Sequence, residues 1–215
     1  MEFAVIGMGR FGRAVARSLA REGQAVLAID LDPERLEQVS GEVDATTRAD
    51  TTDEDAMAAL RLDRMSCVVV AIGSRATEAS LLTVAILRDL QVPRIVARSF
   101  DERHARLLLA IGANEVINPE DDMGARLAWL LARPGILDQF QLGDARVAEV
   151  EAPEAYVGRS LEELDLTGRH GLAILLLRRG EDVVANPGRQ ERIESGDVLV
   201  VLGGEQEIRG LATLR

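Results

Sequence analysis

The chain has 215 residues and a formal net charge of −11, and all 25 of its basic residues are arginines. The absence of lysine excludes mechanisms that need a Schiff-base lysine or the lysine of a G-x-x-x-x-G-K-[ST] phosphate loop. The acidic balance and an aromatic content of 3% also argue against a nucleic-acid partner, because such proteins need basic surface and stacking side chains.

The single cysteine, Cys67, lies in an apolar run at residues 67–72 and is expected to be a buried side chain. One cysteine forms no intrachain disulfide, and no Cys/His cluster indicates zinc, so we expect a reducing, cytoplasmic location. The apolar runs are far shorter than the ~20 residues of a membrane-spanning helix, and the first residues are typical of a strand, not of a signal peptide. A role at a membrane would therefore be that of a peripheral subunit.

Short apolar segments alternate with helical stretches through the first two-thirds of the chain. Strands are expected at residues 3–6, 25–29, 45–49, 67–72, 94–97 and 115–117. Helices are expected at residues 10–22, 33–40, 53–60, 77–90 and 101–111. Runs of successive apolar residues suit strands that are buried on both faces, as in a parallel sheet with crossover helices. The pattern predicts an α/β fold of Rossmann type, a doubly wound parallel sheet.

The last third has a different composition. After one more helix at residues 124–132, strands dominate, at residues 147–150, 172–177, 182–185 and 198–202, with a short terminal helix at 205–211. The sequence therefore predicts two domains, a nucleotide-binding Rossmann domain at residues 1–142 and a small α+β domain at residues 143–215. A domain of about 70 residues is only marginally stable alone and gains from pairing with a second copy.

A G-x-G-x-x-G motif at residues 7–12 follows the first strand and opens the first helix. Gly7 permits the tight turn, Gly9 lets the backbone approach a pyrophosphate, and Gly12 lets helix and strand pack closely. Asp30 ends the second strand, where a carboxylate receives ribose hydroxyls, and it repels the 2′-phosphate of NADP. Together these residues indicate a site for NAD, ATP or ADP. The alternative is a glycine turn that serves packing alone.

Several neighbouring residues have two interpretations. The Arg10 guanidinium can bind phosphate oxygens from inside the loop, or it can be a solvated arginine that opposes the helix dipole. Asp32 is either the cap of the next helix or a second ribose ligand. Asp50 and Thr51 end the third strand, where an adenine would lie, and the Thr52 or Asp53 that follows also suits a helix cap.

The fourth strand ends in the same way. Gly73 and Ser74 follow it directly, so they lie at the carboxyl edge of the predicted sheet. They either border the ligand or form an ordinary strand-to-helix turn.

These residues resemble the regulator of potassium conductance (RCK) domain. The resemblance rests on residues 5–12, Asp30, residues 49–52, residues 71–73 and a second stretch, I-G-A at 111–113 followed by I-N-P-E-D-D-M-G at 117–124. The tail is similar to the small C-terminal RCK domain at residues 158–161, 174–177 and 196–201. The similarity is greatest to the cytoplasmic regulatory subunits of Trk/Ktr-type potassium uptake systems.

The resemblance implies a regulatory function without catalysis. In such families, homodimers assemble into an octameric gating ring that docks on a membrane potassium-translocating subunit. ATP and ADP, or NAD and NADH, favour different shapes of the ring. We therefore expect a nucleotide-sensing regulatory subunit of potassium transport, cytoplasmic and peripheral at the cytoplasmic face of the inner membrane.

The resemblance also implies a set of site residues. The glycine loop would hold phosphates, Asp30 the ribose, and Asp50 with Thr51 the adenine, while Arg10 would sense the terminal phosphate across the dimer. The candidate nucleotide site comprises Gly7, Met8, Gly9, Arg10, Phe11, Gly12, Asp30, Leu31, Asp50, Thr51, Ala71, Ile72, Gly73, Ser74, Arg98 and Glu120. Glu120 would also bind a divalent cation, Mg or Ca, although an acid in the first turn after Pro119 suits the helix dipole equally well.

Some family members bind cyclic di-AMP between paired C-terminal domains. The corresponding segment here is residues 161–174, which includes Arg169 and His170. The family's arginine position is Thr167 in this chain, which counts against this ligand, and His170 is expected to be a turn residue. His104 lies on a polar helix face and is expected to be solvated.

The alternative function is an NAD-dependent oxidoreductase, because many Rossmann domains serve hydride transfer. Such an enzyme needs a proton donor near the nicotinamide. Lysine is absent, the only tyrosine, Tyr156, lies in the predicted second domain, and neither His104 nor His170 has a recognisable partner. The sequence therefore favours a sensor over an enzyme.

Overall fold

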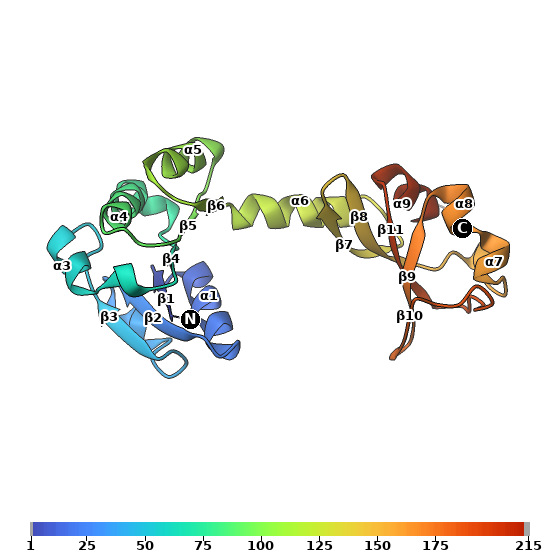
Figure 1. The fold of residues 1–215 in the computed structure, drawn as a ribbon, viewed down its shortest axis with the longest axis horizontal. Helices are drawn as coiled ribbons and strands as arrows, with labels where there is room; N and C mark the ends of the chain where they lie inside the picture. Colours follow the sequence, from blue (N-terminus) through green and yellow to red (C-terminus); the bar gives the residue numbers. More distant parts are fainter. Residues whose placement is uncertain (1, 213–215) are drawn as a thin grey trace. The chain divides into compact units, whose positions relative to one another are not determined.

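The structure, a computed structural model, describes residues 2–212. The chain divides into two compact units that meet between Asp121 and Asp122, and both are drawn in Figure 1. Within residues 2–212, no helix combines the length and the apolar character that crossing a bilayer requires.

The first unit is built on a six-stranded parallel sheet (Figure 1). Its strands are β1 (Glu2–Ile6), β2 (Ala25–Asp30), β3 (Ala45–Arg48), β4 (Cys67–Val70), β5 (Ile95–Arg98) and β6 (Glu115–Ile117). The strand order is β3-β2-β1-β4-β5-β6, so the chain winds outward from β1 to β3 and then crosses back to β4. The expected Rossmann-type doubly wound sheet is confirmed. Its switch point, where such folds bind ligands, lies between β1 and β4.

Helices cover both faces of this sheet. They are α1 (Arg10–Arg21), α2 (Pro33–Glu37), α3 (Glu54–Ala59), α4 (Thr77–Asp89) and α5 (Glu102–Ile111), with short 3-10 helices at η1 (Leu62–Arg64) and η2 (Ser74–Ala76). Successive residues of β1 enter opposite cores: Ala4 packs with α4 and α5 residues on one face, and Val5 packs with α1 residues on the other. This double burial explains why the strands are continuous apolar runs.

The second unit contains a five-stranded antiparallel sheet of order β10-β9-β11-β8-β7. Its strands are β7 (Ile136–Leu142), β8 (Ala145–Glu151), β9 (Ala173–Arg179), β10 (Asp182–Ala185) and β11 (Val198–Gly203). Its helices are α7 (Leu161–Leu164), α8 (Leu166–His170) and α9 (Glu205–Ala212), with a 3-10 helix η3 (Glu154–Tyr156). A single core includes Leu172, Leu177, Leu199 and Ile208, all fully enclosed. The expected small α+β fold is confirmed.

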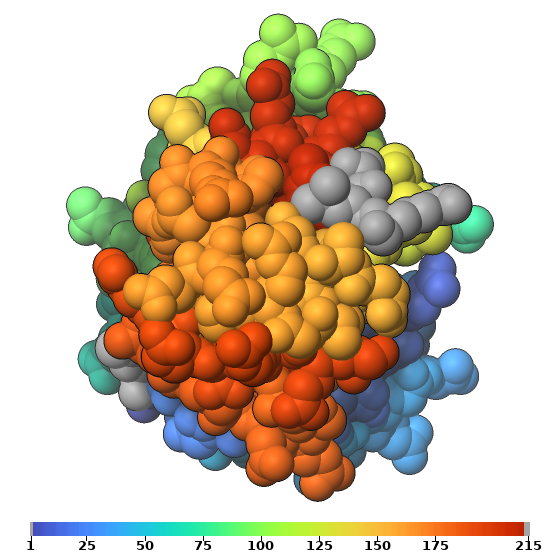
Figure 2. All heavy atoms as spheres, turned by 90° about the vertical axis from the view of Figure 1, so that its right-hand side faces the viewer, coloured from blue at the N-terminus to red at the C-terminus, as the bar shows by residue number. Residues whose placement is uncertain are grey.

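Two segments of this unit that are distant in sequence lie against each other. Ser160 forms an isolated bridge with Arg192, and the Leu161 N–H donates to the Glu191 carbonyl at 2.9 Å. Figure 2 shows the same contact from outside, where the yellow-orange segment near residue 160 adjoins the orange-red segment near residue 190.

The boundary of the units differs from the position expected from composition, between residues 142 and 143. Helix α6 (Pro119–Leu131) starts earlier than the expected 124–132, and β7 was not anticipated at all. β7 pairs with β8 as an antiparallel hairpin, so residues 136–142 belong to the second sheet. The strand was missed because only some of its residues are apolar and its outer half, F-Q-L, is exposed.

The solvent exposure of two side chains in the first unit can be compared with the exposure expected from the sequence. Cys67 is buried, as expected, and burial raises the pKa of its thiol although the nearby Arg94 opposes this. The expectation for His104 is wrong: its side chain is 2% exposed and stacks on Phe100 with ring centroids 4.1 Å apart. Periodicity along α5 did not reveal this contact, because Phe100 precedes the helix and folds back over it.

Candidate functional site

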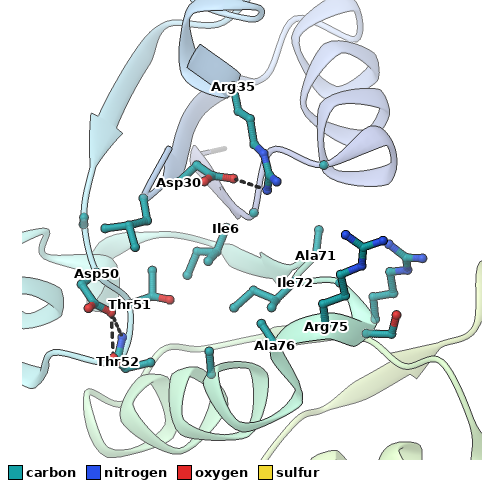
Figure 3. Close-up of a pocket in the computed structure, with 18 of the residues that line it drawn as sticks. Ile6, Asp30, Arg35, Asp50, Thr51, Thr52, Ala71, Ile72, Arg75 and Ala76 are labelled. Atoms are coloured by element: carbon teal, nitrogen blue, oxygen red, sulfur yellow. Dashed lines mark hydrogen bonds and ion pairs between the residues drawn. The ribbon is translucent and has the colours of Figure 1, made fainter. Parts of the chain in front are cut away.

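The carboxyl ends of the parallel strands border a cavity of about 630 Å³ (Figure 3). It lies at the switch point of the sheet, and the loops after β1, β2, β3 and β4 and the last residue of β5 contribute to its wall. The lining residues are Ile6, Gly7, Gly9, Arg10, Arg13, Asp30, Leu31, Arg35, Ala49, Asp50, Thr51, Thr52, Ala71, Ile72, Gly73, Ser74, Arg75, Ala76, Ala79 and Arg98.

The glycine loop has the geometry that its three glycines require. Gly7 has φ +92°, which L side chains rarely adopt, and a Cβ on Gly12 would lie 1.9 Å from the Gly7 carbonyl oxygen. At Gly9, in contrast, a Cβ would meet no atom within 4 Å. Gly7 and Gly12 therefore serve the fold, whereas Gly9 keeps the cavity open at the start of α1.

No side chain caps the first turn of α1, whose N-cap is Gly9. The backbone N–H groups of that turn have no partner within the helix, and together with the helix dipole they attract an anion. Arg13 reaches back from the second turn and donates to the Met8 carbonyl at 2.8 Å, which holds the loop in place. This end of the cavity suits phosphate oxygens.

Asp30 ends β2 and is only 8% exposed. Its Oδ2 accepts the Met8 N–H at 2.5 Å, and its Oδ1 accepts the Asp32 N–H at 2.8 Å. The Arg35 Nη1 lies 3.7 Å from the Asp30 Oδ2 (Figure 3). Each carboxylate oxygen has two acceptor sites, so capacity remains for hydroxyl donors from the cavity. Asp32 itself caps α2 by accepting the Glu34 N–H, so the helix-cap interpretation of this residue is confirmed.

The end of β3 supplies the next wall of the cavity. Asp50 accepts hydrogen bonds from the side chain and the backbone N–H of Thr52, at 2.7 and 3.0 Å, and these bonds lower the pKa of the Asp50 carboxyl (Figure 3). Thr51 is buried and its Oγ1 lies 2.8 Å from the Thr83 Oγ1. Asp53 caps α3 by accepting the Ala56 N–H. Asp50 is therefore the ionised group that faces the cavity here.

At the other side of the sheet, Arg98 ends β5. Its guanidinium forms an ion pair with Glu120, and its Cζ lies 5.7 Å from the centre of the Phe11 ring. The Glu120 carboxylate is largely exposed and does not line the cavity. Among residues 2–212, no three His, Cys, Asp or Glu side chains gather in a metal-binding group. A cation at Glu120 would need further ligands from a bound molecule, and this role stays a prediction.

The structure brings together twelve of the sixteen residues proposed from the sequence. Those lining the cavity are Gly7, Gly9, Arg10, Asp30, Leu31, Asp50, Thr51, Ala71, Ile72, Gly73, Ser74 and Arg98. Met8, Phe11, Gly12 and Glu120 lie behind or beside the wall and act on it through the contacts described above. Their roles toward a ligand stay predictions.

Sequence reasoning missed three arginines of the cavity wall: Arg13, Arg35 and Arg75. The signals were present, because Arg13 lies one turn beyond Arg10, Arg35 three residues after the capping Asp32, and Arg75 directly after Ser74. With Arg10 and Arg98 they make five arginines against two aspartates, Asp30 and Asp50, in a chain that is acidic overall. This local excess of positive charge suits an anionic ligand.

Known proteins share both units. Residues 3–119 match the TrkA-N domain and residues 146–214 match the TrkA-C domain. The chain belongs to the TrkA-domain family. A TrkA-domain relative, Ktr system potassium uptake protein C of Bacillus subtilis (strain 168), is 34% identical over 208 residues, which are 96% of this chain and 94% of that protein. The resemblance to regulatory subunits of Trk/Ktr-type potassium uptake systems is confirmed.

The fold of this chain is also similar to that of several solved structures. The GsuK channel matches 99% of this chain with a TM-score of 0.70 and 18% identity, and the match spans 39% of that protein. The Kef CTD of Shewanella denitrificans in AMP bound form is 26% identical, with a TM-score of 0.51 over 61% of this chain and 82% of that one. The first likeness concerns the fold of the whole chain.

Proposed function

We propose that this chain is the nucleotide-sensing regulatory subunit of a potassium uptake system, acting through a membrane potassium-translocating subunit. The regulatory role in potassium transport is that of the family to which the chain belongs. The nucleotide-sensing part is carried by one observation. The cavity has a buried carboxylate, Asp30, at one wall and an uncapped helix start at Gly9, next to Arg10, at the neighbouring wall.

An adenine nucleotide fits this arrangement chemically. Ribose hydroxyls donate to the free acceptor sites of Asp30, and phosphates accept from the N–H groups at the start of α1 and from Arg10. The Thr51 and Leu31 side chains border the place left for the base. The AMP bound form of the related Kef CTD supports an adenine nucleotide as the ligand class.

The regulatory step needs a ligand that contacts two states differently. The Arg10 side chain is exposed, and no hydrogen bond or ion pair is recorded for its guanidinium within residues 2–212. It is therefore available to an additional phosphate, so that a nucleoside triphosphate and diphosphate would hold the assembly in different arrangements. A divalent cation at Glu120 would add to that difference by neutralising phosphate charge.

We further infer a homodimer as the building block of the ring. Helix α6 exposes Met123, Leu127 and Leu131, which recur every four residues and so share one face of the helix. Leu131 is 74% exposed. The neighbouring edge strand β7 exposes Phe140 and Leu142 as well. Exposed apolar side chains of this kind on a regulatory subunit suit a second copy of the chain.

Such dimers would assemble into an octameric ring at the cytoplasmic face of the membrane. The net charge of −11 argues against attraction to anionic lipid, so docking would depend on specific contacts with the translocating subunit. The TrkA-domain relatives carry names of potassium uptake proteins, which supports a subunit without catalytic activity over an oxidoreductase.

Native mass spectrometry of the purified chain tests these proposals together. We expect an even subunit count, up to eight, and a copurifying adenine nucleotide. Replacing Leu127 by Glu should lower the subunit count and leave the nucleotide bound, because Leu127 does not line the cavity. A wild-type chain that is monomeric at micromolar concentration contradicts the ring, and a chain that takes up no ATP, ADP, NAD or NADH contradicts the sensor.

A further inference from the structure

We propose that Arg75 binds the terminal phosphates of a nucleotide and makes the cavity select a nucleoside triphosphate over a dinucleotide. This inference rests on the proposed nucleotide-sensing function and adds a residue that determines specificity. Arg75 lies in η2, in the segment that connects β4 to α4, is exposed, and lines the cavity. In Figure 3 it lies across Ile72 from Asp50, on the opposite side of the cavity.

Because of the strand order, the two aspartates of the cavity lie on one side of β1, and Arg75 and Arg98 lie on the other. Both aspartates follow strands on one side of β1: Asp30 ends β2 and Asp50 follows β3. On the other side, Arg75 follows β4 and Arg98 ends β5, and Arg10 lies at the centre, after β1. A nucleotide whose ribose binds Asp30 and whose first phosphates bind at α1 therefore continues toward Arg75 and Arg98.

Most of the cavity's arginines already have partners. Arg13 donates to the Met8 carbonyl, Arg35 pairs with Asp30 and Asp32, and Arg98 pairs with Glu120. Within residues 2–212, no hydrogen bond or ion pair is recorded for the guanidinium of Arg75, nor for that of Arg10. Two guanidiniums are thus free to bind oxygen atoms of a ligand, and they follow neighbouring strands, β1 and β4.

The chemistry of the two ligand classes differs at this end of the cavity. The outer phosphates of a nucleoside triphosphate bring negative charge to Arg75, and a guanidinium binds phosphate oxygens by charge-assisted, bidentate hydrogen bonds. The distal ring of oxidised NAD is a cation, which Arg75 and Arg98 would repel. The same position therefore attracts one ligand class and disfavours the other, which is how a site gains specificity.

The structure offers a matched control. Arg64 and Arg75 lie on either side of β4, both exposed, but Arg64 precedes the strand, at the amino edge of the sheet, and does not line the cavity. Replacing either by Gln removes the same charge from the same unit. Only the substitution at Arg75 removes a guanidinium from the wall of the cavity.

The test is isothermal titration of the full chain with ATP, AMP and NAD at constant ionic strength, for the wild type, Arg75→Gln and Arg64→Gln. We expect Arg75→Gln to weaken ATP binding about tenfold or more, to change AMP binding by less than about twofold, and to leave NAD binding equal or tighter. Arg64→Gln should behave as the wild type does.

Each other outcome has a distinct meaning. If Arg75→Gln leaves ATP binding unchanged, or weakens ATP and AMP equally, the assignment of Arg75 to the terminal phosphates is overturned. If both variants weaken ATP equally, the effect is one of net charge, and the assignment is again overturned. A wild-type chain that binds none of the three ligands overturns the proposed nucleotide sensing itself.

Discussion

Among residues 2–212, each unit buries one carboxylate, and the two are used differently. Asp30 in the first unit is 8% exposed and accepts two backbone N–H groups, but its remaining acceptor sites face a cavity. Asp197 in the second unit is 0% exposed. Its two oxygens accept the Arg179 Nε and Nη2 at 2.9 Å each, and Oδ2 also accepts the Glu194 N–H at 2.8 Å. Burial of a carboxylate does not by itself indicate a binding site; unused acceptors that face open space do.

The same contrast appears in the glycines of the first unit. Gly12 is required because backbone occupies the place of a side chain, whereas no atom lies within 4 Å of a Cβ position at Gly9, which leaves that space open to a ligand. Among the described residues, the first unit thus has polar groups without protein partners, and open space beside them, at the edge of its sheet. The second unit pairs its buried carboxylate with Arg179, and it exposes several apolar side chains on α6 and β7.

The largest effect is expected from Gly12→Val. Its Cβ would overlap the Gly7 carbonyl, a backbone atom that cannot move aside without distorting the turn at φ +92°. We expect a loss of about 3 kcal/mol in the unfolding free energy of the first unit, together with loss of nucleotide binding. Hydrogen exchange of the backbone N–H groups in α1 and β1, measured during thermal denaturation, reports the loss of unfolding free energy. Titration with ATP reports the loss of nucleotide binding.

Gly9→Ala is the matched control for this prediction. Gly9 has φ −66°, which alanine adopts without strain, and open space surrounds its Cβ position. We expect an unchanged unfolding free energy and weaker nucleotide binding. If Gly9→Ala destabilised the unit as much as Gly12→Val, the distinction between a folding glycine and a ligand-facing glycine would be wrong.

A smaller effect is expected from Asp197→Asn. Burial alone would raise the pKa of Asp197, but hydrogen bonds from Arg179 and the Glu194 N–H, with the charge of Arg179, together hold it below its ordinary value. Breaking this pair should cost the second unit about 1–3 kcal/mol in unfolding free energy. Trp129 is the only tryptophan and packs against the core of this unit, so its fluorescence reports the transition.

The pH dependence of that effect has a defined sign. The folded pKa of Asp197 is lowered, so its stabilisation is complete above the unfolded pKa of about 4 and is lost as the pH falls through the folded pKa. The difference between the wild type and Asp197→Asn should therefore shrink on acidification below about pH 4. Nucleotide binding at neutral pH should not change, whereas Asp30→Asn should weaken binding more than stability; the opposite pattern would contradict the assignment of the two carboxylates.

The smallest effect is expected from His104. Burial lowers the pKa of its imidazole, although Asp101 opposes this, and neither ring nitrogen has a recorded partner within residues 2–212. The unfolded chain therefore binds a proton more readily, so the first unit should lose up to about 1 kcal/mol as the pH falls below about 6.5. The substitution His104→Leu should flatten this slope, and the second unit should not respond. An unchanged slope would show that another group titrates in this range.

Much of the fold was predictable because its signals are local. Apolar runs such as residues 67–72 and the glycine motif at residues 7–12 indicated a parallel sheet with a ligand-binding turn, and the strand order confirms that fold. β7 was not predictable, because an edge strand with one exposed face has a weak pattern of hydrophobicity. His104 was misjudged for a related reason: helical periodicity cannot register the stacking of Phe100, which lies outside the helix.

By itself, the sequence determined which residues have the chemistry to bind a nucleotide at the start of α1 and at the end of β2, since Gly9, Arg10 and Asp30 occupy fixed positions in a motif. Only the tertiary structure decided which charged groups remain free. Arg13, Arg35 and Arg98 are engaged by partners from other turns or strands, and Asp197 is closed off by Arg179. Charge is a property of a residue, but its availability depends on neighbours that are distant along the chain. For this reason the role of Arg75 became visible only in the folded protein.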